Sequence, residues 1–160
     1  MEKIYVVLIE DQREVLEAVA KDLEFFEDAF VIEECESADE ALQVMEGIYK
    51  RGDHVALIIS DHVMPNKSGV DFLIEVNKDQ RFNRSRKILL TGLATHQDTI
   101  RAINKAAIDK YLEKPWKSED LINCAKVMLT EFILEKGIDY QPYLPYLDHA
   151  TLFESIRKTT

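Results

Sequence analysis

The sequence predicts an α/β fold in which a parallel sheet is covered by helices on both faces. Five short apolar segments alternate along the chain with segments whose apolar residues recur every three or four positions. The first pattern is typical of buried parallel strands and the second of amphipathic helices. At 160 residues, the chain is long enough for one domain with a substantial core and short for two. Alternating strands and helices of this kind build a parallel sheet with crossover helices.

Each predicted strand is a short apolar or β-branched run. We expect strands at residues 4–9, around 31–32, at 55–60, at 87–91 and at 110–112. The first run, Ile-Tyr-Val-Val-Leu-Ile, is the clearest, because no polar residue interrupts it and β-branched residues favour strands. The run around Val31 is the weakest.

Helices are expected between and after these strands. Apolar residues at helical spacing cover 15–26, and further helices are expected at about 38–49, 69–77, 96–106 and 118–135. Ser37 and Glu40 form a capping box for the second helix, and Gly137 can end the last one.

The fifth strand–helix pair closes the predicted domain near residue 128. An aromatic link with two prolines and a short helical segment at 147–158 follow. Because about 30 residues are too few for an independent domain, we expect residues 1–128 to form the domain. Residues 129–160 are expected to extend its last helix and add a tail.

Composition excludes several classes of protein. The net charge of −10 argues against sequence-independent binding of nucleic acid, because such binding needs a basic surface. The two cysteines have neither disulfide-framework nor zinc spacing. No apolar run is long enough to span a membrane, and the first residues lack the layout of a signal peptide. We therefore expect a cytoplasmic protein without direct membrane contact.

Polar side chains end four of the five predicted strands. Glu10 and Asp11 follow the first, Asp61 the third, Thr91 the fourth and Lys114 the fifth. The carboxyl ends of parallel strands lie at one edge of the sheet, where ligands bind in open α/β folds. Taken singly, each residue has an ordinary alternative as a helix cap, a turn residue or a surface amine. Their joint occurrence at one edge indicates a site.

These residue types together suit phosphoryl transfer. Three clustered carboxylates repel one another unless a cation lies among them, and oxygen ligands favour Mg²⁺. Asp61 could then act as a nucleophile and accept a phosphoryl group as an acyl phosphate. Mg²⁺ and the Lys114 ammonium would neutralise the charge of that group, and Thr91 would hydrogen-bond one of its oxygens.

The motifs resemble the receiver domain of bacterial two-component response regulators over residues 3–128. They are Glu10-Asp11, Asp61 followed by Met-Pro-x-x-Ser-Gly, Thr91-Gly92 and Lys114-Pro115, at spacings of 50, 30 and 23 residues. The resemblance implies a flavodoxin-like, doubly wound sheet of five parallel strands in the order 2-1-3-4-5. It also implies phosphorylation of Asp61 by a sensor histidine kinase or a phosphotransfer protein, and conformational control of a downstream protein.

The resemblance also implies the roles of individual residues. The Lys114–Pro115 peptide bond is typically cis in this family. Tyr111 lies where receivers carry a switch aromatic, which moves inward as the threonine approaches the phosphoryl group; an ordinary strand aromatic is the alternative. The implied Mg²⁺ ligands are Glu10, Asp11, Asp61 and the backbone carbonyl of Val63.

Four residues near the predicted site are particular to this sequence. Val63 and Leu93 are apolar, and we expect them to shield an acyl phosphate from the attacking water and to slow its hydrolysis. His62 and His96 are expected to be solvent-exposed loop residues.

Three readings of the output and function are open. The first is a stand-alone receiver that acts through protein contacts. The second is the N-terminal part of a larger enzyme-output regulator, because part of the sequence looks like receivers that precede signalling enzymes. The third is a Mg²⁺-dependent phosphatase with an aspartate nucleophile. Such an enzyme usually has a second acid two residues beyond the nucleophile, where this chain has Val63. We therefore expect no enzymatic turnover of outside substrates.

The extended last helix suggests a surface for self-association. Its apolar stripe continues past the expected domain edge at Met128, Leu129, Phe132 and Ile133. A homodimer through this stripe is one possibility. Packing of the tyrosines and leucines of the tail on the same stripe, within one chain, is the other.

Overall fold

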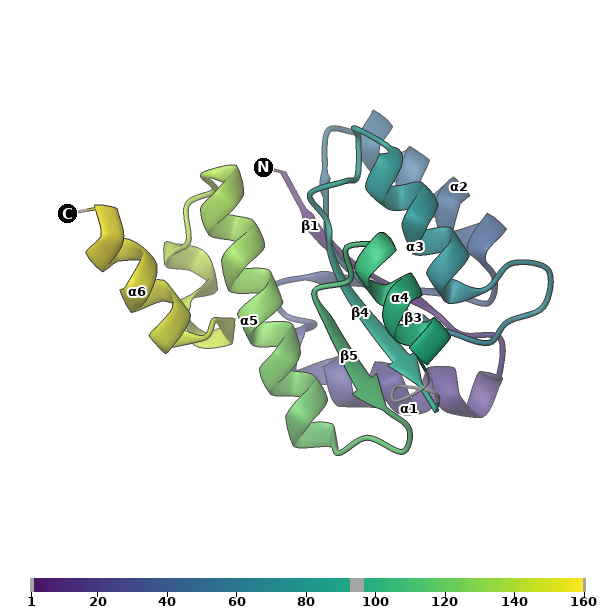
Figure 1. Ribbon diagram of the computed structural model, residues 1–160. Helices are drawn as coiled ribbons and strands as arrows, with labels where there is room; N and C mark the ends of the chain where they lie inside the picture. The colour runs from purple at the N-terminus through teal and green to yellow at the C-terminus, as the bar shows by residue number, and fades with distance from the viewer. Residues whose placement is uncertain (1, 93–96, 160) are drawn as a thin grey trace.

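The computed structural model describes residues 2–92 and 97–159, in which five parallel strands form one sheet (Figure 1). Their order is β2-β1-β3-β4-β5, as the resemblance implied. All four neighbouring pairs are parallel. The strands are β1 (Ile4–Ile9), β2 (Val31–Cys35), β3 (His54–Asp61), β4 (Arg86–Thr91) and β5 (Lys110–Glu113).

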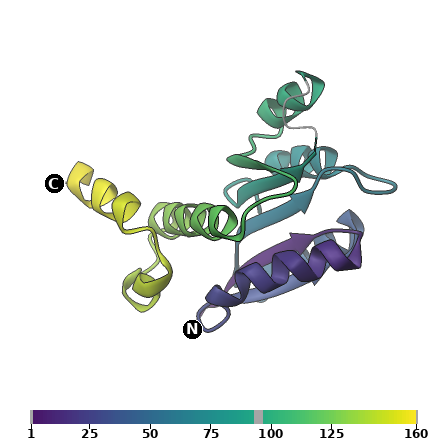
Figure 2. The ribbon, with the colours of Figure 1, turned by 90° about the horizontal axis from the view of Figure 1, so that it is seen from below.

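Helices cover both faces of this sheet (Figure 2). Side chains of α1 and α5 pack on one face, and those of α2, α3 and α4 pack on the other. The helices are α1 (Arg13–Asp22), α2 (Ala38–Lys50), α3 (Gly69–Lys78), α4 (Gln97–Lys105), α5 (Ser118–Lys136) and α6 (His149–Thr159). Two 3₁₀ helices, η1 (Leu23–Phe26) and η2 (Gln141–Tyr146), complete the described elements. None of the described helices is long and apolar enough to cross a membrane.

The central strands carry the core on both faces. In β1, residues 4, 6 and 8 pack toward α1 and α5, whereas residues 5, 7 and 9 pack toward α2 and α3. All six are buried, which explains the uninterrupted apolar run in the sequence. Strand β2 lies at the edge, and its Glu33 and Glu34 are partly or fully exposed. Edge position accounts for its weak sequence signal, and the strand extends beyond the two residues that were clearest in the sequence.

The first predicted helix is divided in the structure. Helix α1 ends at Asp22, and the chain continues as η1 to Phe26. Leu23 and Phe26 are nevertheless buried, as their spacing predicted. The tighter 3₁₀ turn keeps both side chains against the core while the chain begins its approach to β2.

The tail packs back on α5 within the same chain. Gly137 caps α5 in the left-handed conformation, with φ of 70°, and the chain then reverses. The ring of Tyr143 stacks on Phe30 with 5.2 Å between centroids, and Leu147 is 3% exposed. The four side chains of the predicted self-association stripe are buried in the same core. These four side chains are therefore not an exposed surface for self-association.

Candidate functional site

The carboxyl ends of β1, β3 and β5 bring three charged side chains together. The Lys114 ammonium donates to Asp61 Oδ1 at 2.5 Å and to Glu10 Oε1 at 3.2 Å. Strand β4 ends beside them, because the backbone N–H of Lys114 donates to the carbonyl of Thr91 at 3.0 Å. The Lys114–Pro115 peptide bond is cis, as the resemblance implied. The predicted meeting of these residues at one sheet edge is therefore observed.

Three carboxylates form a cluster at this edge. Glu10, Asp11 and Asp61 each offer one oxygen, and the three oxygens lie within 4.8 Å of one another. Glu10 and Asp61 are only 2% and 5% exposed. Asp11 does not cap α1, since the N-cap is Gln12 and it makes no side-chain cap hydrogen bond. The ordinary alternative for Asp11 is thus not realised.

The donor set fits a divalent cation. Within the described part of the chain, Asp11 Oδ1 is a buried oxygen that has no hydrogen-bond partner. Burying such an oxygen is costly unless something compensates it. Carboxylate oxygens with room for water are the ligands that Mg²⁺ prefers. The orphaned oxygen lies in the cluster where the sequence predicted the metal.

Burial and mutual repulsion shape the electrostatics of the cluster. Burial raises the pKa of Glu10 to about 7, and the nearby charge of Asp61 adds to this rise. A hydrogen bond from the backbone N–H of Gln12, at 3.1 Å, opposes it. Burial lowers the pKa of Lys114, but the hydrogen bond and charge of Asp61 outweigh burial, and the net pKa is raised. Lys114 is therefore held as a cation facing the acids.

A close approach between β3 and α3 fixes the backbone at Asp61. The N–H of Gly69 donates to the carbonyl of His62 at 2.8 Å. A Cβ on Gly69 would lie 1.9 Å from the backbone oxygen of Asp61, so only glycine fits there. Ser68 caps α3 by accepting from the N–H of Asp71 at 3.1 Å. The Ser-Gly pair of the motif thus starts a helix directly against the end of β3.

The residues around the cluster differ in exposure. Val63 is 68% exposed and Tyr111 is 44% exposed, whereas Thr91 is buried. His62 is half-buried, and burial lowers its pKa, so the expectation of a solvent-exposed residue was wrong. The backbone carbonyl of His62 accepts from the N–H of Gly69, the first residue of α3. Leu93 and His96 lie outside the described residues.

Comparison with known proteins decides the family. The sequence profile of the response regulator receiver domain matches residues 6–126. The chain belongs to this family. The response regulator Rre1 of Synechocystis sp. is 31% identical over 121 residues, which are 75% of this chain and 49% of that protein. The hydrogenase transcriptional regulatory protein HoxA of Cupriavidus necator is 29% identical over 121 residues, 76% of this chain and 23% of that protein.

Solved receiver domains share the fold. The signal receiver domain of an HD domain-containing protein from Pseudomonas fluorescens superposes with a TM-score of 0.69 at 24% identity. The match covers 82% of this chain and 98% of that one. The chain spans less than half the length of both curated relatives named above.

Proposed function

We propose that this receiver is a phosphorylation-dependent switch in which Asp61 accepts a phosphoryl group from a histidine kinase or a phosphotransfer protein. The observation that carries the proposal is the contact of 2.5 Å between Asp61 and Lys114 inside an acidic cluster at the sheet edge. A nearly buried carboxylate paired in this way is held in one position, as an in-line nucleophile must be. The predicted cytoplasmic location suits such donors.

The transfer is a single displacement. One carboxylate oxygen of Asp61 attacks phosphorus, and the bond from phosphorus to the donor breaks, with its electron pair leaving on the donor atom. Glu10, Asp11, Asp61 and the backbone carbonyl of Val63 would hold Mg²⁺. When bound, this ion neutralises charge on the phosphoryl oxygens.

Lys114 and Thr91 respond to the new group. The Lys114 ammonium loses its contact with the free carboxylate oxygen and pairs with a phosphoryl oxygen. The Thr91 hydroxyl hydrogen-bonds another. Because the backbone N–H of Lys114 is hydrogen-bonded to the carbonyl of Thr91, a movement at the end of β4 or β5 is passed to the end of the other strand.

Tyr111 is the proposed reporter of that change. It is 44% exposed on β5, so an inward movement would bury a ring that now lies at the surface. Such a rearrangement would alter the surface that a downstream protein meets. Direct binding of nucleic acid is not part of the proposal, because the chain carries a net charge of −10.

We also propose the domain organisation that the sequence predicted. We assign residues 1–128 to the receiver and residues 129–160 to the extended helix and tail. An aspartyl phosphatase has less support, because Val63 replaces the general acid such enzymes usually need two residues beyond the nucleophile.

Incubation with acetyl phosphate and Mg²⁺, followed by intact-mass measurement, tests the proposal. We expect one phosphoryl adduct on the wild type, none without Mg²⁺, and none on Asp61→Ala. Adducts on both proteins, or on neither, would falsify the role of Asp61. Thr91→Ala serves as a matched control, because it should still accept the phosphoryl group while losing the inward movement of Tyr111.

A further inference from the structure

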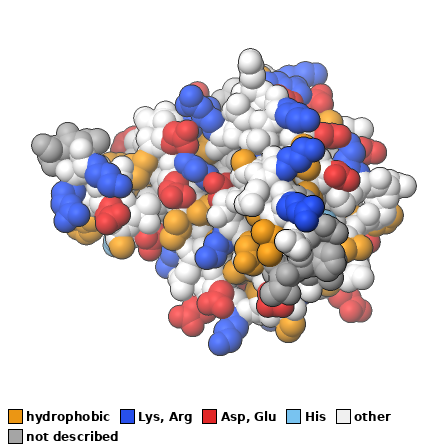
Figure 3. Space-filling view, viewed as in Figure 1, with side chains coloured by type: hydrophobic (Ala, Val, Ile, Leu, Met, Phe, Trp, Pro, Cys, Tyr) orange, Lys and Arg blue, Asp and Glu red, His pale blue; other side chains and the backbone are white. Residues whose placement is uncertain are grey.

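A basic loop lies at the edge of the sheet opposite Asp61. Residues 78–87, Lys-Asp-Gln-Arg-Phe-Asn-Arg-Ser-Arg-Lys, connect α3 to β4 and contain five basic residues and one acid. The whole chain, in contrast, carries a net charge of −10. In the space-filling view, Lys and Arg side chains lie among Asp and Glu side chains on the right, where α3 and α4 lie (Figure 3). Local positive charge on an acidic protein attracts anions.

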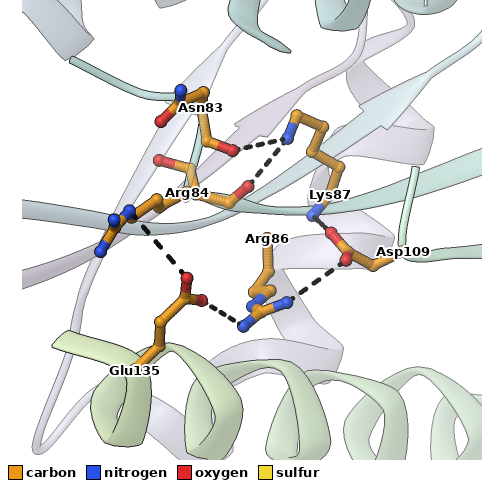
Figure 4. Close-up of polar contacts among 7 residues, drawn as sticks. Asn83, Arg84, Arg86, Lys87, Asp109 and Glu135 are labelled. Carbon is orange, nitrogen blue, oxygen red and sulfur yellow. Dashed lines mark hydrogen bonds and ion pairs between the residues drawn. The ribbon is translucent and has the colours of Figure 1, made fainter. Parts of the chain in front are cut away.

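The carboxylates near this loop do not balance its cations. Glu135 on α5 is shared by two arginines, with Arg86 Nη2 at 2.5 Å and Arg84 Nε at 4.0 Å (Figure 4). Asp109 contacts Arg86 Nη1 at 3.5 Å and also accepts from the backbone N–H of Lys87 at 2.7 Å. Arg84 is therefore only weakly paired, and its side chain is 62% exposed. Most of its five N–H donors remain available.

A pocket of about 280 Å³ opens beside the loop. It lies between the end of α2, the start of β3, the basic loop and the last turns of α5. Three aromatic and three cationic residues line it: Tyr49, Phe82, Phe132, Arg81, Arg84 and Lys136. Asp53 is the one acid among the lining residues, and its carboxylate already accepts from the backbone N–H of Lys3 at 2.9 Å and pairs with Arg51 at 3.7 Å.

Arg81 is fixed in advance at the wall of this pocket. Its Nε and Nη2 donate to Asp79 at 3.1 and 2.8 Å, which leaves three N–H donors. Its guanidinium lies 4.9 Å from the ring centre of Phe82 and 5.9 Å from that of Tyr49. A guanidinium held in this way binds a phosphate at a low entropic cost.

The ring of Tyr49 adds a second kind of contact. It is 49% exposed although it lines a pocket, and it packs edge-on against Phe82 at 6.0 Å. A half-exposed aromatic ring in a cationic pocket offers a surface on which a planar ring that carries a phosphate can stack. The pocket volume is near the lower limit of about 300 Å³ for small-molecule sites. A single nucleotide therefore suits the pocket better than a dinucleotide.

We propose that this pocket binds a nucleoside monophosphate. Arg84, Lys136 and the remaining donors of Arg81 contact the phosphate, and the base stacks on Tyr49. The site lies at the opposite edge of the sheet from Asp61, so it is a second ligand site independent of the phosphorylation proposed above.

Titration calorimetry with AMP tests this site. We expect saturable binding of one AMP per chain to the wild type, and an affinity at least about tenfold lower for the double variant Arg84→Gln/Lys136→Gln, which removes two charge-assisted contacts. Both side chains are exposed, so the variant should fold, and its thermal unfolding confirms this. Arg101→Gln/Lys105→Gln, which removes one arginine and one lysine at exposed positions of α4, makes the same change in charge and should bind AMP as the wild type does.

Three further titrations separate the contacts. Adenosine lacks the phosphate, ribose 5-phosphate lacks the base, and inorganic phosphate lacks both base and sugar; each should bind at least about tenfold more weakly than AMP. Tyr49→Leu should lower the affinity for AMP without changing the affinity for ribose 5-phosphate. No heat at about 1 mM AMP would overturn the proposal. It would equally be overturned by unchanged affinity in the double variant, or by equal binding of AMP and inorganic phosphate.

Discussion

Alanine at Gly69 is predicted to destabilise the receiver and to displace its phosphorylation site. The new Cβ would lie 1.9 Å from the backbone oxygen of Asp61, 2.9 Å from its carbonyl carbon and 2.8 Å from Ser60 Oγ. Ordinary carbon–oxygen contacts are about 3.3 Å or longer. The start of α3 and the end of β3 must therefore separate by about 1 Å or more. Overpacking of a buried position costs about 1–3 kcal/mol.

The same displacement should slow phosphorylation. A shift of about 1 Å at reacting groups can cost about 100-fold in rate. Urea denaturation followed by circular dichroism gives the loss of stability, and intact mass after acetyl phosphate treatment gives the rate. Gly47→Ala in α2 is the matched control. Its Cβ would meet Arg51 Nη1 at 3.4 Å, so this change should instead stabilise the protein by about 0.5–1 kcal/mol. A Gly69→Ala protein as stable and as quickly phosphorylated as the wild type would refute the close approach.

Three further predictions concern Glu10, Val63 and Leu147. Without Mg²⁺, the free energy of unfolding of the wild type should fall by up to about 3 kcal/mol relative to that of Glu10→Gln as the pH rises from 4.5 through 7. The reason is that the folded protein retains a proton on Glu10 that the unfolded chain releases. An equal pH dependence of the two proteins in urea denaturation would contradict this. Val63→Asn should speed loss of the phosphoryl group from Asp61, measured by intact mass over time, and an unchanged rate would remove the shielding role. Leu147→Ala should cost about 2–5 kcal/mol in thermal or urea unfolding, since Leu147 joins the core; a cost below about 1 kcal/mol would show that the tail does not pack there.

The central strands could be predicted from the sequence because burial on both faces leaves a continuous apolar run. Strands β1, β3 and β4 begin or end within two residues of their predicted bounds. The division of the first helix at Asp22 could not be predicted in the same way. Leu23 and Phe26 keep helical spacing, and their turn is set by contacts with distant segments rather than by local sequence.

The site was predictable to the extent that strand ends determine it. Glu10, Asp61 and Lys114 meet because parallel strands end at one edge, which the order of motifs already indicates. The half-buried state of His62 depends on how closely α3 approaches β3. That distance cannot be predicted from the spacing of the motifs in the sequence. The AMP pocket depends similarly on four segments that are far apart along the chain.

The most direct measurement for the central claim is the position of the phosphoryl group on the chain. Borohydride reduces an aspartyl phosphate to homoserine, so treatment of the phosphorylated protein followed by peptide mass spectrometry identifies the modified residue. We predict homoserine at position 61 alone, absent from protein not exposed to acetyl phosphate and from Asp61→Ala. Homoserine at position 11 or at any other aspartate, with position 61 unchanged, would contradict the account.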